Sequence, residues 1–264
     1  MTSDAATLSP ASSVLLGDDD PPPFRATRGN ESSPFVITCD HAGRRLPRGL
    51  EMLGLSAAQL ETHVAWDIGA AGVGVRLAAE LGAFLVLQTY SRLVIDCNRP
   101  LGTPDSIVKE SERVVIPGNR DVSPSEAEAR ARAIFHPYHD CIRGELDRRR
   151  GRPTIFVALH TFTPVFMGVA RPWHVGILYQ RDARLARALL ELLREDAALV
   201  VGDNEPYRVS DQTDYGVVHY GERRGLPHVE LEIRQDLVAD DAGQAHWAER
   251  MARALRRASA MFLE

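Results

Sequence analysis

Short apolar runs and longer stretches with apolar residues at helical spacing alternate along this chain. The short runs have the length and the β-branched or aromatic content of strands. They cover residues 34–40, 83–90, 93–96, 153–162, 174–180, 197–207 and 227–236. The helical spacing occurs in residues 56–82, 123–151, 183–195 and 242–263. The pattern therefore predicts strands and helices that follow one another along the chain.

Capping residues support the two longest predicted helices. Ser56 precedes the first, which ends at Gly82, and Ser123 opens the second, which ends at Gly151. Alternation of this kind predicts an α/β fold with a mixed, largely parallel central sheet and helices on both faces. In such a fold the functional site lies at the carboxyl ends of the strands.

The first 30 residues differ in composition from the rest. They are rich in Ser, Asp, Pro and Ala and include "DDDPPP" at 18–23. Such a segment buries too little apolar surface to offset the entropy lost on ordering, so we expect residues 1–30 to form a flexible N-terminal arm. The remaining residues, 31–264, have the length of one domain and carry neither an internal repeat nor a linker.

Composition and charge exclude several classes of protein. The chain has 31 basic and 36 acidic residues, a formal charge of −5, and no long basic block, so we expect no nucleic-acid partner. Its three cysteines form no CxxC pair, which argues against a disulfide framework or a thiolate zinc site. Neither an apolar stretch long enough to span a membrane nor a signal peptide is evident. We expect a cytoplasmic protein without a membrane partner.

Polar side chains follow several of the predicted strands directly. The run "VITCDH" ends in Asp40 and His41, "LVIDCNR" ends in Asn98 and Arg99, and "IFVALHTF" carries His160 near its end. A single histidine at such a position is more often a hydrogen-bonded structural residue than a ligand. The recurrence of the pattern favours a shared site where these strands end.

The strand predicted at 227–236 carries polar residues on one face. The period of two places Glu230, Glu232 and Arg234 on the same side. Buried strands of a parallel sheet are apolar on both faces, so these groups require partners. The glutamates could pair with Arg234 or serve in a site.

Asp67 lies within the predicted helix 56–82, four residues after His63. Residues at this spacing share a helix face, so the two side chains could bind a metal together or form an ordinary surface pair.

In combination these residues supply the groups of a zinc hydrolase. Zinc in a catalytic site takes three protein ligands and leaves one position open for water. A nearby glutamate can take a proton from that water and return it to a leaving amine. An arginine offers a fork for a substrate carboxylate.

Eight motifs in the chain carry a family resemblance. They are "CDHAGRRLP", "HVAWDIGA", "YSRLVIDCNRP", "HPYH", "LHTFTP", "GVARPWHVGILY", "VGDNEPY" and "VELEIRQDL". In this order the chain resembles the N-formylglutamate amidohydrolase family over about residues 34–262.

The resemblance implies a fold similar to that of zinc carboxypeptidases and the aspartoacyl and succinylglutamate amidohydrolases. It implies that His41 and His160 bind one divalent metal, Zn²⁺. It also implies that Asn98 and Arg99 hold the substrate carboxylate and that Glu232 or Glu230 is the general base.

One position departs from the carboxypeptidase pattern. The residue three positions after the first histidine, a carboxylate ligand there, is Arg44 here. The third metal ligand must therefore lie elsewhere, and Asp67 in "WDIGA" is favoured over Asp40. For the base, Glu232 is favoured because it begins "EIRQDL".

Four further residues are candidates for substrate contact. Arg92 in "YSR" and Arg171 in "ARPWH" could bind substrate or brace a loop by a salt bridge. His219 in "VVHYGERRG" could donate to a reaction oxyanion or have a structural role. Arg234 is the fourth candidate for substrate contact.

The expected function is metal-dependent hydrolysis of an N-acyl amino acid, with a small acid and the free amino acid as products. The alternatives are a peptidase or deacylase acting on another amide, such as a cell-wall peptide, and a binding protein that has kept the fold without the chemistry. The second alternative would be expected to lack His41, His160 or the late glutamate, and this chain has all three.

Overall fold

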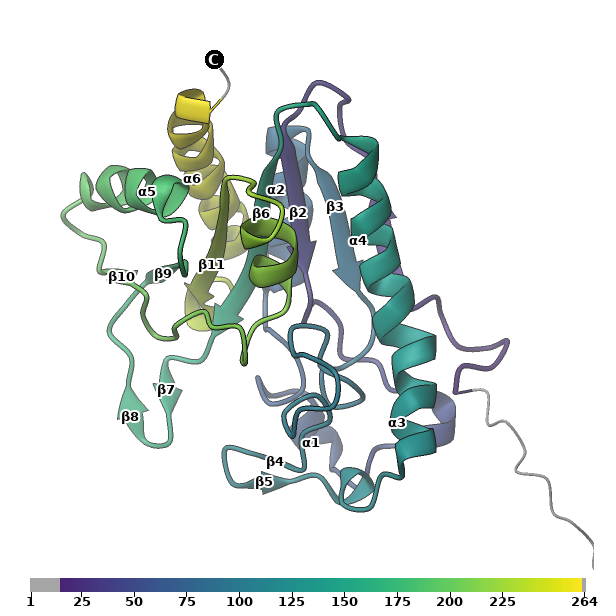
Figure 1. The fold of residues 1–264 in the computed structure, drawn as a ribbon. Helices are drawn as coiled ribbons and strands as arrows, with labels where there is room; N and C mark the ends of the chain where they lie inside the picture. Colours follow the sequence, from purple (N-terminus) through teal and green to yellow (C-terminus); the bar gives the residue numbers. More distant parts are fainter. Residues whose placement is uncertain (1–14, 263–264) are drawn as a thin grey trace, which may run out of the picture.

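The computed structural model describes residues 15–262 (Figure 1). Within them, a 7-stranded sheet has the strand order β1-β3-β2-β6-β11-β9-β10. The strands are β1 (Phe24–Thr27), β2 (Phe35–Cys39), β3 (Phe84–Gln88), β6 (Ile155–Phe162), β9 (Val175–Leu178), β10 (Val201–Asp203) and β11 (His228–Arg234). Neighbouring strands from β3 to β11 are parallel, whereas β1 and β9 run antiparallel to β3 and β11. The prediction of a mixed, largely parallel sheet is confirmed.

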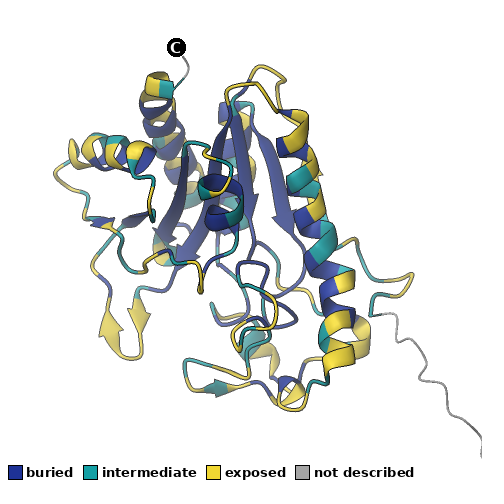
Figure 2. Cartoon of the chain, in the orientation of Figure 1, coloured by how far each residue is buried: buried dark blue, intermediate teal, exposed yellow. Residues whose placement is uncertain are grey.

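Helices cover both faces of this sheet, as predicted. One face packs against α2 (Ala70–Leu81), α5 (Arg184–Arg194) and α6 (Asp241–Ser259). The other packs against α4 (His136–Arg148) and a π-helical segment, Val217–Glu222. The central strands are buried on both sides and appear dark blue in Figure 2. This double burial explains why their sequences are nearly continuous apolar runs.

Shorter elements complete the described part of the chain. They are α1 (Ala57–Leu60), α3 (Pro124–Arg130), the π-helical turn Ala131–Phe135, the hairpin strands β4 (Glu110–Ser111), β5 (Val114–Val115), β7 (Val165–Phe166) and β8 (Val169–Ala170), and the 3-10 turns Arg48–Leu50, Pro117–Asn119, Gln235–Leu237 and Ala260–Phe262. The helix predicted at 123–151 is thus α3 and α4 joined by a π-helical turn. No helix in residues 15–262 is long and apolar enough to cross a membrane.

The segment predicted as one helix from 56 to 82 is interrupted. Ser56 caps α1, but the chain leaves the helix at Glu61 and resumes a helical path only at α2. Gly69, the residue before α2, has φ +84°, and a Cβ there would lie 2.3 Å from the Val238 carbonyl oxygen. Only glycine fits this backbone. Asp67 is therefore in a connecting loop, and its backbone N–H donates to the His41 carbonyl at 3.0 Å.

The strand predicted at 93–96 is instead a buried loop. The chain turns after β3, and the N–H of Asp96 donates to the carbonyl of Ser106 at 2.8 Å. Val94 and Ile95 fill the core beneath this loop. A short apolar run has the same periodicity in a buried loop as in a strand, so the pattern could not separate the two.

The predicted N-terminal arm is only partly described, because residues 1–14 lie outside the described residues. Residues 24–27 of the arm form β1, which pairs antiparallel with β3. This pairing satisfies the outer backbone groups of β3, which would otherwise be an open sheet edge. The structure leaves untested the prediction that residues 31–264 are one catalytic domain.

Candidate metal centre and active site

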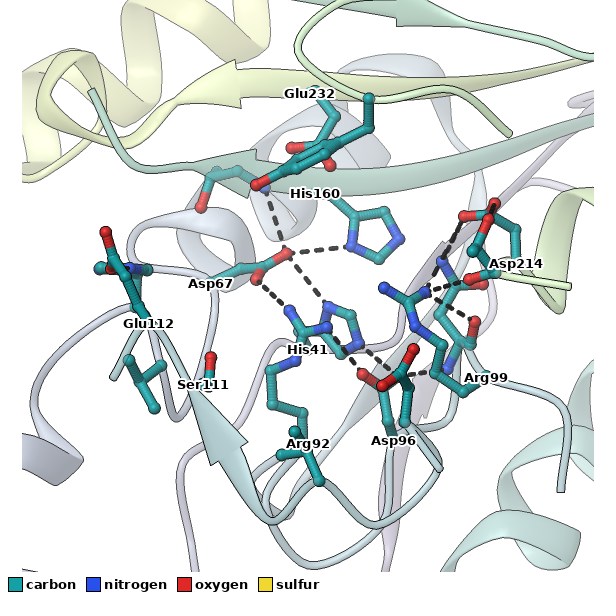
Figure 3. Close-up of a pocket in the computed structure, with 18 of the residues that line it drawn as sticks. His41, Asp67, Arg92, Asp96, Arg99, Ser111, Glu112, His160, Asp214 and Glu232 are labelled. Atoms are coloured by element: carbon teal, nitrogen blue, oxygen red, sulfur yellow. Dashed lines mark hydrogen bonds and ion pairs between the residues drawn. The ribbon is translucent and has the colours of Figure 1, made fainter. Parts of the chain in front are cut away.

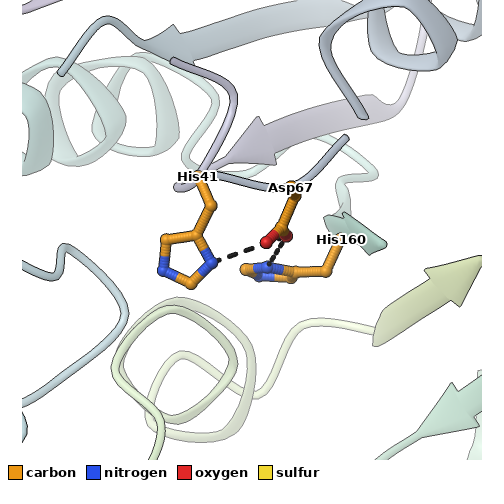
Figure 4. Close-up of side chains that lie close together, drawn as sticks. All are labelled: His41, Asp67 and His160. Carbon is orange, nitrogen blue, oxygen red and sulfur yellow. Dashed lines mark hydrogen bonds and ion pairs between the residues drawn. The ribbon is translucent and has the colours of Figure 1, made fainter. Parts of the chain in front are cut away.

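Three segments bring His41, Asp67 and His160 together where the parallel strands end. His41 lies just after β2, His160 lies near the end of β6, and Asp67 lies in the loop between α1 and α2. All three side chains are buried, and one ligand atom from each lies within 4.8 Å of the others. Figure 4 shows both imidazole rings directed at the Asp67 carboxylate.

Both histidines face Asp67 with the same ring nitrogen, Nδ1. The Nδ1 atoms of His41 and His160 lie 3.5 and 3.0 Å from Asp67 Oδ2. Each Nε2 atom faces a second carboxylate: Asp96 Oδ1 at 2.8 Å for His41, and Asp40 Oδ2 at 3.7 Å for His160. Histidines that bind metals typically have a carboxylate or carbonyl on the other ring nitrogen, which fixes the ring. Asp96 occupies that position for His41, whereas Asp40 lies 3.7 Å from His160 Nε2, beyond hydrogen-bond distance.

Arg92 lies between two of these carboxylates. Its guanidinium donates to Asp96 Oδ2 at 2.7 Å and lies 3.8 Å from Asp67 Oδ1. Burial would raise the pKa of Asp96, but Arg92 and His41 hold it well below its usual range. Arg92 therefore keeps the carboxylate of Asp96, behind His41, ionised. The positive charge of Arg92 is in turn compensated by Asp96 and Asp67.

Tyr138 holds the carboxylate oxygen of Asp40 that does not face His160. The Tyr138 hydroxyl donates to Asp40 Oδ1. Burial would raise the pKa of Asp40, but its interaction with His160 holds the pKa below its usual value. Asp67 lines the cavity described below and Asp40 does not. Of the two aspartates considered as third ligand, the structure thus brings Asp67 to the Nδ1 side of both histidines.

The donor atoms around this cluster fit a divalent cation. Several buried polar atoms have no hydrogen-bond partner among the described residues. They are Nδ1 of His41, Nε2 of His160, Oδ2 of Asp40 and one Oε2 atom on each of Glu230 and Glu232. Buried polar atoms without partners are rare and costly. Two imidazole nitrogens and a carboxylate oxygen also match the ligand set of catalytic zinc.

Glu230 and Glu232 project from β11 toward this cluster. Glu232 is paired with His160 in the parallel register of β11 and β6, and Glu230 with Ala158. Both side chains are buried and line the cavity. Burial, with a contribution from Asp214, raises the pKa of Glu230 to about 8, and burial also raises the pKa of Glu232 well above its usual value. With this pKa, the Glu230 carboxyl group can exchange protons near neutral pH.

Asn98 and Arg99 lie on the loop after β3 rather than at a strand end. The Asn98 side-chain oxygen accepts from the N–H groups of Tyr215 and Gly216, both at 3.0 Å. Arg99 donates to the carbonyls of Asn98 and Thr213 and lies 4.0 Å from Asp214 Oδ1. Asn98 is therefore engaged in bracing the loop, whereas the Arg99 charge is opposed by one carboxylate at the limit of ion pairing.

The cluster opens into a cavity of about 490 Å³, within the range of small-molecule sites. Most of the residues predicted for the site line it. They are His41, Asp67, Arg92, Asn98, Arg99, His160, Glu230 and Glu232. Figure 3 shows Asp67, Arg92, Arg99 and Glu232 arranged around the two histidines, with Glu232 and Arg99 on different sides.

Three residues predicted to contact substrate are absent from the cavity lining. Arg171 donates to the Tyr207 hydroxyl at 2.8 Å and lies 4.5 Å from the Phe166 ring centroid. Arg234 pairs with Asp236 at 2.8 Å. His219 stacks on Tyr215, with ring centroids 3.7 Å apart. The structural alternative considered for His219 fits its surroundings. Arg171 makes no salt bridge within residues 15–262, and Arg234 pairs with Asp236 instead of Glu230 or Glu232.

Other lining residues were not predicted from the sequence. They are chiefly Glu112, Tyr207, Arg208 and Asp214. His63, considered from the sequence as a metal-binding or surface partner of Asp67, also lines the cavity, but its side chain contacts Glu112. Tyr207 ends the motif "VGDNEPY", and Arg208 follows it, so that motif was a usable signal. Glu112 lies in a two-residue turn between two very short strands, where neither periodicity nor a motif marks it.

The profile of the N-formylglutamate amidohydrolase family matches residues 33–239. An "N-formylglutamate deformylase" of Pseudomonas putida is 32% identical over 130 residues, 44% of this chain and 46% of that protein. The alignment thus spans less than half the length of this relative.

Two solved structures share the fold. A gene product from Agrobacterium tumefaciens has a TM-score of 0.90 and 35% identity, covering 95% of this chain and all (100%) of the other. The N-formylglutamate amidohydrolase from Ralstonia eutropha has a TM-score of 0.67 and 19% identity, covering 90% and 97% of the two chains. At 19% identity, the match to the Ralstonia eutropha protein shows a shared fold and nothing about function. From the profile match, this chain belongs to the N-formylglutamate amidohydrolase family.

Proposed function

We propose that the protein is a metal-dependent amidohydrolase that cleaves the amide of an N-acyl amino acid such as N-formylglutamate. The products would be formate, or another small acid, and the free amino acid. The observation that carries this proposal is the buried His41–Asp67–His160 cluster with the carboxyl group of Glu232 beside it in one cavity. Membership of the family and the name of the Pseudomonas putida relative support it.

One divalent metal per chain, zinc, would be held by His41, Asp67 and His160. When bound, it would supply Lewis-acid polarisation of the amide carbonyl and lower the pKa of a water molecule. Asp96 would hold the His41 ring through its other nitrogen, at 2.8 Å, and Asp40 is the carboxylate near Nε2 of His160, at 3.7 Å.

Glu232 would transfer the protons of the reaction. Its side chain lies opposite His160 in the strand register and has an oxygen without a hydrogen-bond partner among the described residues. It would take a proton from the attacking water and give it to the leaving amine. Glu230 lies on the same face of β11 and is the alternative base.

Cations that line the cavity would bind the carboxylates of the substrate. Arg99, with Asn98 bracing its loop, would hold the α-carboxylate. Arg208 also lines the cavity and makes no hydrogen bond or ion pair within residues 15–262, so it is available for a side-chain carboxylate. Arg92 is less suited to this role because Asp96 and Asp67 already surround its charge.

Incubation of the zinc-loaded protein with N-formyl-L-glutamate tests the proposal. Formate and glutamate are expected to appear in equal amounts, and the Glu232→Gln protein should release neither at a comparable rate. A zinc-loaded wild type that binds N-acyl amino acids without releasing an acid would indicate a binding protein. Turnover confined to peptide amides would indicate the peptidase alternative.

Arg99→Ala should reduce the preference for a free-acid substrate over the corresponding carboxamide. The loss of a charge-assisted pair is worth about 1.5–3 kcal/mol, or roughly a 10- to 150-fold change in kcat/KM. Kinetics on N-formylglutamate and its α-carboxamide measure this ratio, and Arg184→Ala, a distant exposed arginine on α5, is a control. If the Arg99→Ala protein kept the wild-type ratio, the carboxylate assignment would be wrong.

A further inference from the structure

Two small hairpins contribute to the wall of the cavity. The hairpin β4–β5 contributes Glu110, Ser111 and Glu112, and the hairpin β7–β8 contributes Phe166. In Figure 1 both hairpins lie beyond the carboxyl ends of the central strands, on the side of the sheet where the site is found. They are far apart in sequence, so a tertiary contact must hold them together.

The side chain of Glu112 provides that contact. Its Oε1 atom accepts a hydrogen bond from the Met167 N–H at 2.7 Å, at the tip of the other hairpin. Its Oε2 atom lies 2.5 Å from Nε2 of His63, a lining residue from the loop between α1 and α2. The Glu112 side chain is 18% exposed, and that of His63 is 27% exposed. One carboxylate therefore joins three separate segments of the cavity wall.

The backbone of both turns is unusual for these residues. Glu112 and Arg113 have φ values of 48° and 67°, and Met167 has 52° before Gly168 at 83°. Two-residue hairpin turns with positive φ at both positions favour Asn and Gly, so Glu, Arg and Met are strained here. Strain of this kind persists where surrounding contacts impose it, commonly at functional sites. In the β4–β5 turn the strained residue is Glu112, the same residue whose carboxylate contacts Met167 and His63.

The wall that Glu112 closes lies across the metal cluster from Arg99. Figure 3 shows Glu112 beside Asp67 on one side of the histidines and Arg99 with Asp214 on the other. With the α-carboxylate of the substrate on Arg99 and the amide carbon at the cluster, the acyl group extends toward Glu112. This wall is polar and acidic, because Glu110 also lines it.

We propose that Glu112 determines acyl-group selectivity: the link to Met167 and His63 closes the cavity wall against long acyl chains, and its carboxylate disfavours an acyl chain with a terminal carboxylate. The inference rests on the proposed function and adds to it the identity of the residue that bounds the acyl group. A long acyl chain would have to separate the two hairpins, and a succinyl group would place a second carboxylate against Glu112 and Glu110.

Two substitutions separate the contributions of the link and the charge. Glu112→Ala removes both, whereas Glu112→Gln keeps an oxygen that can accept from the Met167 N–H and removes only the charge. Glu110→Ala is a matched control, because Glu110 lies on the same hairpin and lines the same cavity, but its side chain makes no hydrogen bond or ion pair within residues 15–262. Metal content and thermal unfolding of each variant show whether the fold and the cluster are intact.

The experiment measures kcat/KM for the N-formyl, N-acetyl, N-hexanoyl and N-succinyl derivatives of glutamate. For Glu112→Ala the hexanoyl-to-formyl ratio should rise by at least about tenfold, the scale on which pockets discriminate methylene groups. For Glu112→Gln only the succinyl-to-formyl ratio should rise, and Glu110→Ala should leave the hexanoyl ratio at its wild-type value.

A folded, metal-loaded Glu112→Ala protein with wild-type ratios would overturn the inference while leaving the proposed function intact. A Glu110→Ala protein that accepts hexanoyl glutamate as readily as Glu112→Ala would also overturn it, because the link would then not be the determinant. A wild type that hydrolyses no member of the panel would reject the proposed function and, with it, the acyl site.

Discussion

Glu232→Gln is expected to lower kcat by about 10²–10⁴-fold, the usual contribution of a positioned general base, with the metal retained. Glutamine has the shape of glutamate but cannot take a proton from water at neutral pH. The side chain is buried, lies opposite His160 in the strand register and makes no contribution to the His41–Asp67–His160 group. The substitution should therefore slow the chemical step and leave metal binding unchanged.

The measurement is kcat and metal content for Glu232→Gln and Glu230→Gln in parallel. Glu230 is the natural comparison because it has the same residue type, strand, face and burial. Its substitution should have the smaller effect on kcat. The reverse order, with Glu230→Gln inactive and Glu232→Gln active, would move the base two residues along β11.

His160→Ala and His41→Ala are each expected to abolish detectable metal binding and, with it, turnover. Each substitution removes one of the three protein ligands proposed for the metal and leaves only two. Elemental analysis of the purified variants measures the effect. Full metal occupancy in both folded variants would show that the metal binds elsewhere.

Metal affinity ranks the two aspartates considered as the third ligand. Asp67→Asn should weaken metal affinity more than Asp40→Asn, because Asp67 Oδ2 faces Nδ1 of both histidines, whereas Asp40 faces the opposite side of His160. Removal of an outer carboxylate such as Asp40 typically costs about 10- to 100-fold in affinity. Competition with a chelator compares the two, and a larger loss from Asp40→Asn would transfer the ligand role to it.

The parts of the site that lie on regular strands could be predicted from the sequence. His160, Glu230 and Glu232 interrupt apolar strands at positions where a buried sheet should be apolar, and this conflict is visible without a structure. His41 follows an apolar strand directly. The period of two also placed the glutamates correctly on one face.

The parts that depend on loops could not be derived in the same way. Asp67 is in the cluster because the predicted helix is interrupted between Glu61 and Gly69, and the sequence pattern of that helix does not show the interruption. Asp96 contacts His41 because the apolar run before it is a buried loop. The role of Glu112 depends on a contact between two distant hairpins, which no local pattern encodes.

The central claim is that hydrolysis depends on one metal ion at the His41–Asp67–His160 cluster. Titration of zinc into chelator-treated protein, with formate release from N-formyl-L-glutamate as the readout, tests it most directly. We expect activity to be near zero without metal, to rise linearly, and to level off at about one equivalent per chain, with no recovery in His160→Ala. Full activity in the metal-free protein, or equal recovery in His160→Ala, would contradict the claim.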